Sequence, residues 1–391
     1  MRRAAVVPPG ASPPHRARST WASVGEDANM THPIRRIGVL TSGGDAPGLN
    51  AVIRAVVKTA SNGYGWTVAG IESGFEGLIG KPRVRPLDLA AVSGLLPRGG
   101  TILGSTNKGH FAPVPTNGES YSDPGPYKEL AANVRRLAID ALVIIGGEGS
   151  QGIACELSKY GVRAMGVPKT IDNDLYGCDQ TFGFDTALTV ATEAIDRLHT
   201  TAESHDRVMV VEVMGRHAGG LAVTSGIAGG ADVVLIPEFP LTVERCAELI
   251  QQRHTRDKDF SIVVVSEGWP LTREAGADEL STVTGERDAF GHLRLGGVGQ
   301  QLADALEGIT GFETRVTTLG HLQRGGTPTA YDRVLATRYG LLAGGLALER
   351  RFGLMTALRG VDVVPAPLDA AVAELRTVPR EYYALAEAFF G

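Results

Sequence analysis

The sequence predicts an α/β protein with two Rossmann-like, three-layer lobes whose sheets are mostly parallel. Short, fully apolar runs alternate along the chain with helix-length segments, and two of these runs lead through glycine-rich loops into a helical pattern. The length of 391 residues and the hydrophobic content of 43% are the third observation. A chain of that size exceeds one ordinary domain and can bury substantial cores.

The first strand-loop-helix unit begins at Ile37. IGVL is a short apolar run, TSGGDAPG follows it, and apolar residues then recur every three or four positions from Leu49 to Ala60. That spacing makes one buried helix face. Pro47 suits the first helical turn, because the N–H that proline lacks would have no partner there.

The second unit is ALVIIGGEGSQGIACELSKYG. Ala141 to Ile145 is predicted as a buried strand and Gly146 to Gly149 as the loop before a helix. Two such units imply a parallel sheet.

Further elements predict a second sheet. Strands are expected at residues 208–214 and 262–266, and Asp185 is expected to cap a helix with an apolar face. Apolar periodicity lapses over residues 272–291, which predicts a surface loop before a helix near residues 300–306.

Composition excludes several classes of function. The formal charge of −5 is spread without long acidic or basic runs, so neither nucleic acid nor a membrane surface is an expected partner. Cys155, Cys178 and Cys246 are odd in number and far apart, which indicates neither a disulfide framework nor a zinc site. No apolar run approaches the roughly 20 residues of a membrane span. We therefore expect a soluble protein of the reducing cytoplasm.

Residues 1–30 differ from the rest of the chain. They are rich in proline, arginine and serine and show no helical or strand period, which predicts a disordered extension. An arginine-rich transit peptide and an upstream start codon, with Met30 beginning the functional chain, are alternatives that the residues leave open.

Two glycine loops have a form suited to phosphate. In Gly43 to Asp45 and Gly146 to Ser150, backbone N–H groups and a helix N-terminus could meet an anion, although glycine there could also serve only a tight turn. Neither is a Walker loop, because no Lys-Ser/Thr pair follows. Glu148 is a candidate Mg²⁺ ligand, since magnesium prefers oxygen and needs few carboxylates; the alternative is a solvated side chain.

PKTIDND is the densest acidic cluster. Asp172 and Asp174 lie two residues apart beside Lys169, Thr170 and Asn173. In an extended segment they would face the same side, so one carboxylate could act as a general base while the other orients metal or backbone. The alternative is an Asx-type turn in which these side chains satisfy their own backbone.

Three further places carry candidate ligand contacts. Arg216 in MGRHAGG follows an apolar strand, and His321 and Arg324 lie three apart in GHLQRGG, predicted as a glycine-bounded loop. A guanidinium can grip a phosphate in two places at once. Glu267 ends a predicted strand, where ligands of open α/β sheets usually bind.

In this order and spacing, TSGGDAPGLN, GGEGS, PKTIDND, VVEVMGRHAGG and GHLQRGG resemble the 6-phosphofructokinase family, and most closely its actinobacterial ATP-dependent branch. The resemblance runs from about Ile34 to near the C-terminus. It implies the phosphofructokinase fold, with a phosphoryl-donor lobe at residues 31–183 plus 323–372. The sugar-phosphate lobe would comprise residues 184–322 plus 373–391.

The resemblance implies that phosphoryl transfers from Mg-ATP to the 1-hydroxyl of fructose 6-phosphate, the glycolytic step that gives fructose 1,6-bisphosphate and ADP. Asp172 would be the base and Asp174 a second catalytic carboxylate, with Thr170 and Arg216 stabilising the transferring group. The implied donor contacts are Gly44, Asn107, Lys108, Gly147, Glu148, Gly149 and Ser150, with Mg²⁺ at Glu148. The implied sugar-phosphate contacts are Thr170, Ile171, Asp172, Arg207, Met214, Gly215, Arg216, Glu267, Arg315, His321, Leu322, Gln323 and Arg324.

Arg207 and Arg315 taken alone would be solvated charges at the start of strand-like runs. They match positions that the family supplies from a neighbouring subunit, which implies a homotetramer with shared sites. Two positions depart from the family pattern: Glu148 replaces the usual Asp, and Asn107 stands where many ATP enzymes have arginine. Lys108 could supply the missing charge.

Two positions bear on the donor. Gly149 is the ATP-type residue, because pyrophosphate enzymes of the family carry an Asp there that blocks the nucleotide. Lys169 is typical of the pyrophosphate enzymes. We weight Gly149 more heavily, since steric exclusion decides access, so ATP is the expected donor and pyrophosphate the alternative.

Two other functions share part of this pattern. An NAD or lipid kinase would share a GGDG-type loop but not the other motifs, and a catalytically silent sugar-phosphate sensor would bind without turnover. The family's effector site is matched only in part: Arg54, Lys58 and Lys258 keep positive charge, whereas His199 and Asp232 depart, so we interpret the cations as solvated surface charge.

Overall fold

The computed structural model describes residues 33–106, 109–111, 114–116, 119–121, 124–256, 258–272 and 297–391. The predicted N-terminal extension and almost all of the predicted loop at residues 272–291 lie outside these ranges, as do Asn107 and Lys108. Residues 34–391 form one compact unit.

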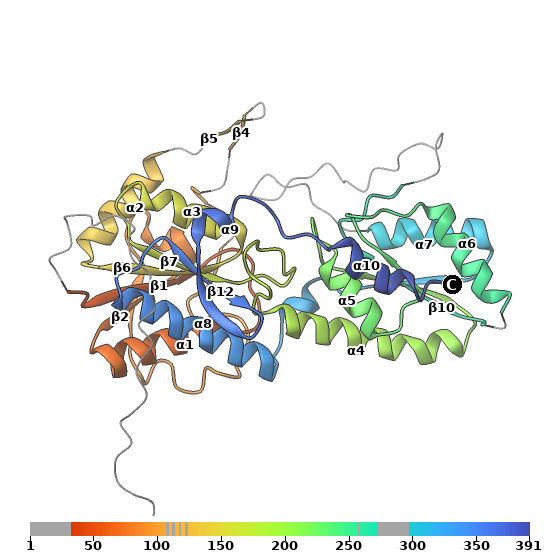
Figure 1. Ribbon diagram of the computed structural model, residues 1–391, viewed down its shortest axis with the longest axis horizontal. Coiled ribbons are helices and arrows are strands. Elements are labelled where there is room, and N and C mark those ends of the chain that lie inside the picture. Colours follow the sequence, from red (N-terminus) through yellow and green to blue (C-terminus); the bar gives the residue numbers. More distant parts are fainter. Residues whose placement is uncertain are drawn as a thin grey trace, which may run out of the picture. The chain divides into compact units, whose positions relative to one another are not determined.

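Helices and strands alternate along most of the chain, as predicted (Figure 1). The strands are β1 (Arg36–Thr41), β2 (Thr67–Ile71), β3 (Val84–Leu87), β4 (Val114–Thr116), β5 (Glu119–Tyr121), β6 (Ala141–Gly146), β7 (Ala164–Pro168), β8 (Val208–Val213), β9 (Val233–Leu235), β10 (Ser261–Ser266), β11 (Thr314–Thr318), β12 (Leu354–Arg359) and β13 (Asp362–Pro367). The helices are α1 (Leu49–Lys58), α2 (Pro124–Arg136), α3 (Glu148–Ser158), α4 (Phe184–Glu203), α5 (Gly220–Ala228), α6 (Val243–His254), α7 (Val298–Thr310), α8 (Ala330–Leu348), α9 (Leu368–Ala371) and α10 (Arg380–Glu387), with a π-helix η1 (Thr59–Tyr64) and 3₁₀ helices η2 (Gly74–Leu78) and η3 (Gly320–Arg324).

The first sheet has seven strands in the order β13-β12-β7-β6-β1-β2-β3. Its inner pairs are parallel, and only the edge strands β13 and β3 run antiparallel to their neighbours. Helices α2, α3 and α9 cover one face and α1 and α8 the other (Figure 1). Both faces are therefore buried, which explains why β6 is apolar at five successive positions before its final glycine.

The second sheet has four parallel strands in the order β11-β8-β10-β9. Met209, Val211 and Val213 of β8 belong to a core shared with α4, α5 and α10, whereas Val208 and Val210 belong to a core shared with α6 and α7. This alternation follows from the period of two in a strand. It gives the second sheet a helical layer on each face, so both predicted three-layer lobes are confirmed.

Several local predictions need correction. Pro47 precedes helix α1 rather than lying in its first turn, because Gly48, at φ 110°, is the residue before the helix. Asp185 does not cap α4, since Gly183 precedes that helix in a left-handed conformation; Asp185 lies in the first turn and accepts a hydrogen bond from Thr329. His321 to Arg324 form a 3₁₀ helix instead of a loop.

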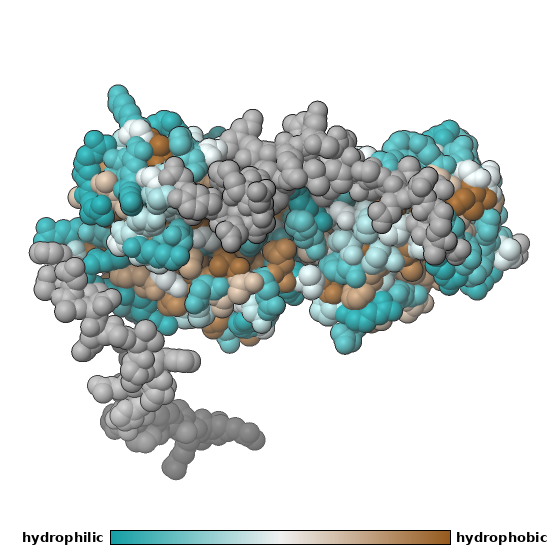
Figure 2. Space-filling view, turned by 90° about the horizontal axis from the view of Figure 1, so that it is seen from above, coloured by the Kyte–Doolittle hydropathy of each residue, from teal (hydrophilic) through white to brown (hydrophobic). Residues whose placement is uncertain are grey.

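No helix in the described ranges combines the length and apolar character that a membrane crossing requires. The face shown in Figure 2 mixes hydrophilic areas with smaller hydrophobic ones. Exposed apolar side chains also lie along α8, on one side of the helix: Tyr331, Val334, Leu341 and Leu348.

Candidate active site

The N-terminus of helix α3 meets the end of strand β6 with almost no loop. β6 ends at Gly146 and α3 begins at Glu148, so the predicted four-residue loop is reduced to Gly147, which is extended. A side chain at Gly146 would collide with Ser150, which requires glycine there, whereas a Cβ at Gly149 would meet nothing within 4 Å. The first turn of α3 therefore presents backbone N–H groups beside open space, an arrangement suited to phosphate.

The GGD turn lies beside two cations from distant parts of the chain. The ammonium of Lys169 donates to the carbonyl of Gly44, and Arg324 Nη1 donates to the carbonyl of Asp45 over 3.2 Å. A Cβ on Gly44 would lie 2.9 Å from Arg324 Nη1, so glycine permits this approach. Burial, together with the nearby Arg324 charge, lowers the pKa of Lys169 to about 8.

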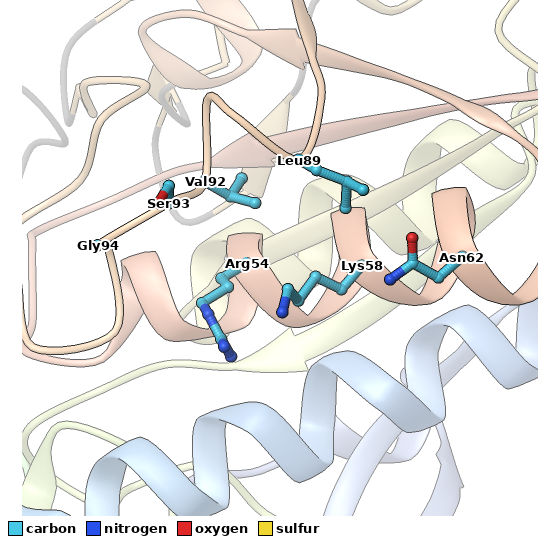
Figure 3. A pocket seen from close by; sticks show the side chains of 7 residues that line it. All are labelled: Arg54, Lys58, Asn62, Leu89, Val92, Ser93 and Gly94. Carbon is cyan, nitrogen blue, oxygen red and sulfur yellow. The ribbon is translucent and has the colours of Figure 1, made fainter.

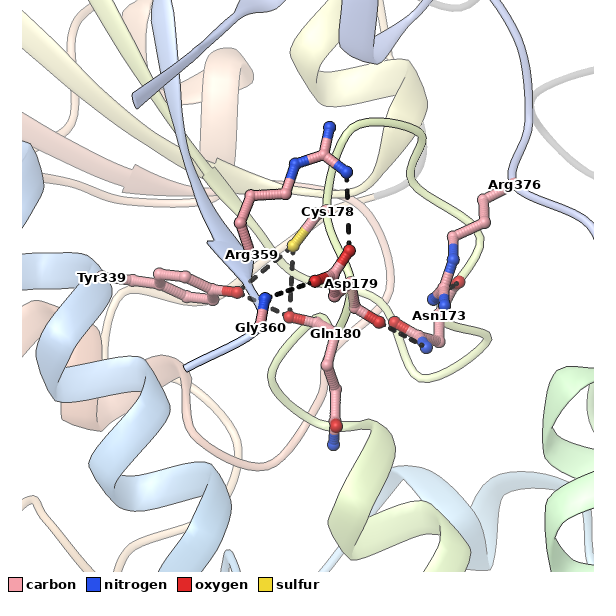
Figure 4. A network of polar contacts seen from close by, with 8 residues as sticks. All are labelled: Asn173, Cys178, Asp179, Gln180, Tyr339, Arg359, Gly360 and Arg376. Atoms are coloured by element: carbon pink, nitrogen blue, oxygen red, sulfur yellow. Dashed lines mark hydrogen bonds and ion pairs between the residues drawn. The ribbon is translucent and has the colours of Figure 1, made fainter. Parts of the chain in front are cut away.

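The catalytic-loop candidate, residues 170–174, follows strand β7. The N–H of Asp172 donates to Thr170 Oγ1 over 3.1 Å, and Thr181 Oγ1 donates to the carbonyl of Thr170 over 2.7 Å. Asn173 is left-handed at φ 55°. Its Oδ1 accepts from the N–H of Thr181 over 2.9 Å, and its amide donates to the carbonyl of Asp179 (Figure 4).

The Asx-turn alternative is therefore wrong for Asp172. Its Oδ1 is buried and has no hydrogen-bond partner among the described residues. A buried, unpaired carboxylate oxygen is costly to keep unless a ligand or a proton meets it.

The pKa of Asp172 is raised to about 7. Burial is the largest cause and the neighbouring charge of Asp174 the second, while Arg324 and Lys169 oppose the rise. A carboxylate with a pKa near neutrality can take up a proton during a reaction, as a general base must.

Glu267 and the segment Met214–Arg216 follow the ends of neighbouring strands. The N–H of Glu267 donates to Val213 O over 2.8 Å, and Ser266 Oγ donates to the carbonyl of Gly215 over 2.5 Å. Burial raises the pKa of Glu267, against the opposing effect of Arg216. Since Glu267 and Arg324 both act electrostatically on Asp172, the structure brings these predicted residues to one place.

The 3₁₀ helix η3 presents its side chains in different directions. Gln323 is buried, and its Oε1 accepts from the N–H of Met214 over 3.4 Å. Arg324 turns towards the GGD turn, whereas His321 and Leu322 are exposed, Leu322 to 69%. Gln323 thus joins η3 to the end of β8, and the two exposed side chains make no such link.

Arg207 and Arg315 are not brought to this place within one chain. Both ion-pair with Glu313, Arg207 over 2.8 Å, at the amino ends of β8 and β11. Glu267 and Arg216 lie beyond the carboxyl ends of the same sheet. Six residues of strand span roughly 20 Å, so these two arginines cannot reach Asp172 of their own chain.

Two carboxylates of the described residues are candidate magnesium ligands, but they belong to no preformed cluster of three or more ligands. No cluster of three or more potential metal-binding side chains occurs within the described ranges. Glu148 lies in the first turn of α3, and Asp172 has an unsatisfied buried oxygen. These residues fit Mg²⁺, which usually takes one or two carboxylates and completes its shell with waters and substrate phosphates.

The partly matched effector positions lie elsewhere. Arg54 and Lys58 line a cavity of about 300 Å³ with Asn62, Leu89, Val92, Ser93 and Gly94 (Figure 3). Asp232 is buried, ion-pairs with Arg253 over 2.9 Å and accepts from the N–H of Ile262. His199 hydrogen-bonds the carbonyl of Gly229. Asp232 and His199 therefore support the second lobe's own backbone.

Sequence reasoning missed residues that act through the backbone. Asp179 accepts from the N–H of Gly360 over 2.6 Å, and the guanidinium of Arg376 donates to the carbonyl of Asn173 (Figure 4). The backbone N–H of Arg376 donates to the carbonyl of Asp174. Glu238 accepts from the N–H groups of Gly219 and Val378. No local pattern marks these contacts, because each joins residues far apart in the sequence.

Comparison with known proteins agrees with this geometry. The family model described as "Phosphofructokinase" matches residues 36–346. An ATP-dependent 6-phosphofructokinase of Chloroflexus aurantiacus is 56% identical over 89% of this chain and 94% of its own length. A pyrophosphate--fructose 6-phosphate 1-phosphotransferase of Amycolatopsis methanolica is 54% identical over 91% of this chain and 100% of its own. The phosphofructokinase structure from Saccharomyces cerevisiae superposes with a TM-score of 0.71 at 30% identity, covering 90% of this chain and 46% of the yeast chain. The chain belongs to the phosphofructokinase family.

Proposed function

We propose that this protein is an ATP-dependent 6-phosphofructokinase, which transfers the terminal phosphoryl group of Mg-ATP to the 1-hydroxyl of fructose 6-phosphate. The observation that carries the proposal is the buried, unpaired Oδ1 of Asp172, with a pKa raised to about 7, at the meeting point of the family motifs. The reaction belongs to glycolysis, and the cytoplasm is the compartment in which the three free cysteines would stay reduced.

Asp172 takes the proton from the sugar 1-hydroxyl as that oxygen attacks phosphorus. Thr170 Oγ1 accepts a hydrogen bond from the N–H of Asp172, so its own proton is directed elsewhere and can donate to the transferring phosphoryl group. Arg216 stabilises the negative charge of that group, and Asp174 keeps the pKa of Asp172 raised.

Glu148 would hold the magnesium ion together with donor phosphate oxygens. When bound, the ion neutralises charge that develops on the transferring group. The N–H groups at the start of α3, residues 147–150, hold the donor phosphates. Asn107 and Lys108 remain proposed donor contacts.

ATP is favoured over pyrophosphate by the open space at Gly149. A nucleotide needs that space, whereas an Asp side chain would fill it. Lys169 points to the other donor, and a relative named for pyrophosphate is 54% identical. Lys169, however, donates to the carbonyl of Gly44 inside the protein, a contact that does not depend on the donor.

The two sheets support the proposed division of labour. The first sheet belongs to the donor lobe, residues 31–183 plus 323–372, because the open turn of α3 follows its strand β6. The second sheet belongs to the sugar-phosphate lobe, residues 184–322 plus 373–391, which carries Arg216 and Glu267.

The active sites are shared between subunits of a homotetramer. Arg207 and Arg315 lie at the far end of the second sheet from the base of their own chain, so they contribute only to a neighbour's site. The exposed apolar side of α8 is a surface that subunit contact would cover.

Hybrid oligomers test the shared site. Asp172→Asn and Arg315→Ala subunits should each show strongly reduced turnover as homo-oligomers. After mixed refolding, hybrids contain sites with both intact residues, and turnover should return. Unchanged inactivity in hybrids whose mixed composition native mass spectrometry confirms would contradict sharing.

Product formation tests the function itself. The purified chain, incubated with fructose 6-phosphate and Mg-ATP, should form fructose 1,6-bisphosphate and ADP in equal amounts, and a chelator of Mg²⁺ should stop the reaction. The matched control is Asp172→Asn, which has the same shape but no base. Binding of fructose 6-phosphate by calorimetry without product from ATP or pyrophosphate would instead favour the sensor.

A further inference from the structure

The C-terminal part of the chain crosses between the two lobes beside the proposed base. After α9 the chain leaves the first sheet, and α10 packs on the second (Figure 1). We call the connecting residues 374–378 the strap. Leu375 forms an isolated antiparallel bridge with Leu175, directly after the catalytic loop.

One end of the strap is fixed to the catalytic loop. The backbone N–H of Arg376 donates to the carbonyl of Asp174 over 2.8 Å. Its guanidinium Nη1 donates to the carbonyl of Asn173 over 3.3 Å, and Figure 4 shows the two residues side by side. These contacts reach the backbone on the C-terminal side of Asp172 and leave its carboxylate untouched.

The other end of the strap is fixed to Glu238. The N–H of Val378 donates to Glu238 Oε1 over 3.0 Å. The N–H of Gly219 donates to both oxygens of the same carboxylate, over 2.9 and 3.0 Å. Gly219 ends the segment that carries Arg216, so one carboxylate joins that segment to the strap.

The catalytic loop and the segment that leads into α5 are also in direct contact. A Cβ built on Gly220 would lie 3.4 Å from the carbonyl oxygen of Asp172. The start of α5 therefore packs against the backbone of the base. A shift of the strap would move Asp172 relative to Arg216, and misplacement by about 1 Å can cost about 100-fold in rate.

We propose that Glu238 and the strap are positioning elements that set the general base Asp172 against the phosphoryl-stabilising Arg216. Neither Glu238 nor Arg376 needs to touch substrate for this role. The inference rests on the proposed function for its kinetic consequence, but the mechanical link between the two loops can be measured without turnover.

The central variant is Glu238→Ala, which removes the acceptor for both N–H groups. The matched control is Asp140→Ala, because Asp140 Oδ2 likewise accepts from two backbone N–H groups, those of Arg35 and Arg36, at the amino end of β1. Glu238→Gln keeps one acceptor oxygen and serves as the conservative rescue.

Kinetics give the first readout. Glu238→Ala should lower kcat about 10- to 100-fold while KM for fructose 6-phosphate changes less than about threefold, since the loss falls on transition-state geometry. Glu238→Gln should recover most of kcat, and Asp140→Ala should lower the melting temperature without lowering kcat. Equal kcat in Glu238→Ala and Asp140→Ala would overturn the proposal.

Hydrogen exchange gives the second readout and does not require activity. In Glu238→Ala, amide exchange should accelerate in residues 170–175 as well as in 215–220 and 374–378. Acceleration confined to the immediate neighbours of Glu238 would overturn the link. Failure of the proposed function would appear separately, as an inactive wild type whose exchange still responds.

If Glu238→Ala does not fold, Arg376→Met carries the test. It removes the Nη1 bond to Asn173 and keeps the backbone bond to Asp174. A severalfold loss of kcat with faster exchange in residues 170–175 is expected, and wild-type values of both would overturn the proposal.

Discussion

The catalytic loop and the first turn of α3 lie at the carboxyl ends of neighbouring strands, β7 and β6, but they are held very differently. Residues 170–174 receive hydrogen bonds from Thr181 on one side and Arg376 on the other. Gly149 borders open space. A base must be held within about half an ångström of its working position, whereas a donor site must admit and release a ligand. On the proposed assignment, the structure holds the base more firmly in place than it restricts the donor site.

Relatives of similar identity carry names for two different donors. Proteins named for ATP and for pyrophosphate are 56% and 54% identical to this chain, so the donor can change while most of the sequence stays similar. A change at a position that borders open space disturbs no packing. A change at Asn173 in the catalytic loop would remove the contacts that its side chain makes with Thr181 and Asp179.

The largest expected effect is on kcat when Asp172 of the catalytic loop is replaced. Asp172→Asn should lower kcat by about 10²- to 10⁴-fold, the usual contribution of a general base, because the amide cannot accept the proton. KM for fructose 6-phosphate should stay within severalfold of wild type. Steady-state kinetics on folded protein measures both values, and near wild-type turnover would mean that Asp172 is not the base.

The next largest expected effect is on donor selection when Gly149, which borders open space, is replaced. Gly149→Asp should leave the protein folded, because a Cβ there meets nothing within 4 Å. Its carboxylate would enter the donor space, and kcat/KM for ATP should fall about 100-fold, since like charges placed together cost several kcal/mol. The ratio of kcat/KM for ATP to that for pyrophosphate is the measurement. An unchanged ratio would mean that Gly149 does not select the donor.

A smaller effect concerns pH. With a pKa of about 7, Asp172 is protonated below neutrality and cannot act as a base, so kcat/KM should fall as the pH decreases through about 7. Lys169 lowers the pKa of Asp172, so Lys169→Met should move this acidic limb to higher pH. The pH profile of both proteins checks this, and a limb that stays in place or moves to lower pH would refute the pairing.

The smallest expected effect on kcat is that of replacing Cys178, which follows the catalytic loop in the sequence. Cys178 is buried, donates to the carbonyl of Gln180 over 3.2 Å and contacts Tyr339 Oη, as Figure 4 shows. Cys178→Ala should cost about 1–2 kcal/mol of unfolding free energy while kcat stays within about twofold, because residues 170–174 keep their own contacts. Thermal denaturation beside kinetics tests this, and a large loss of kcat would show that the loop depends on this thiol.

The sequence predicts local pattern well and long-range contact poorly. Residues 141–145 and 262–266 are recognisable as strands from the sequence because both faces of each sheet are buried and the runs are continuously apolar. The sequence does not predict the starts of α1 and α4 correctly, since the left-handed glycines Gly48 and Gly183 precede these helices instead of a first-turn Pro47 or a capping Asp185.

In the candidate site, too, residues in local patterns are predictable from the sequence and residues that act through long-range contacts are not. Asp172, Glu267 and Arg324 were predicted because each lies in a motif or at a strand end, and the structure brings them together. Glu238 and Arg376 were missed, because their contacts are with backbone groups about 19 to 203 positions away and leave no periodic trace. Arg207 and Arg315 ion-pair with Glu313 within the chain, and their proposed role at the active site requires a neighbouring subunit.

One measurement tests most directly the contrast between the catalytic loop and the open first turn of α3. It is the rate of fructose 1,6-bisphosphate formation by one preparation of the wild-type protein with Mg²⁺ and fructose 6-phosphate, using ATP and pyrophosphate in parallel. We expect turnover with ATP and little or none with pyrophosphate, because the space beside Gly149 is open. Turnover with pyrophosphate alone would contradict the donor assignment, and turnover with neither would contradict the assignment of Asp172 as a working base.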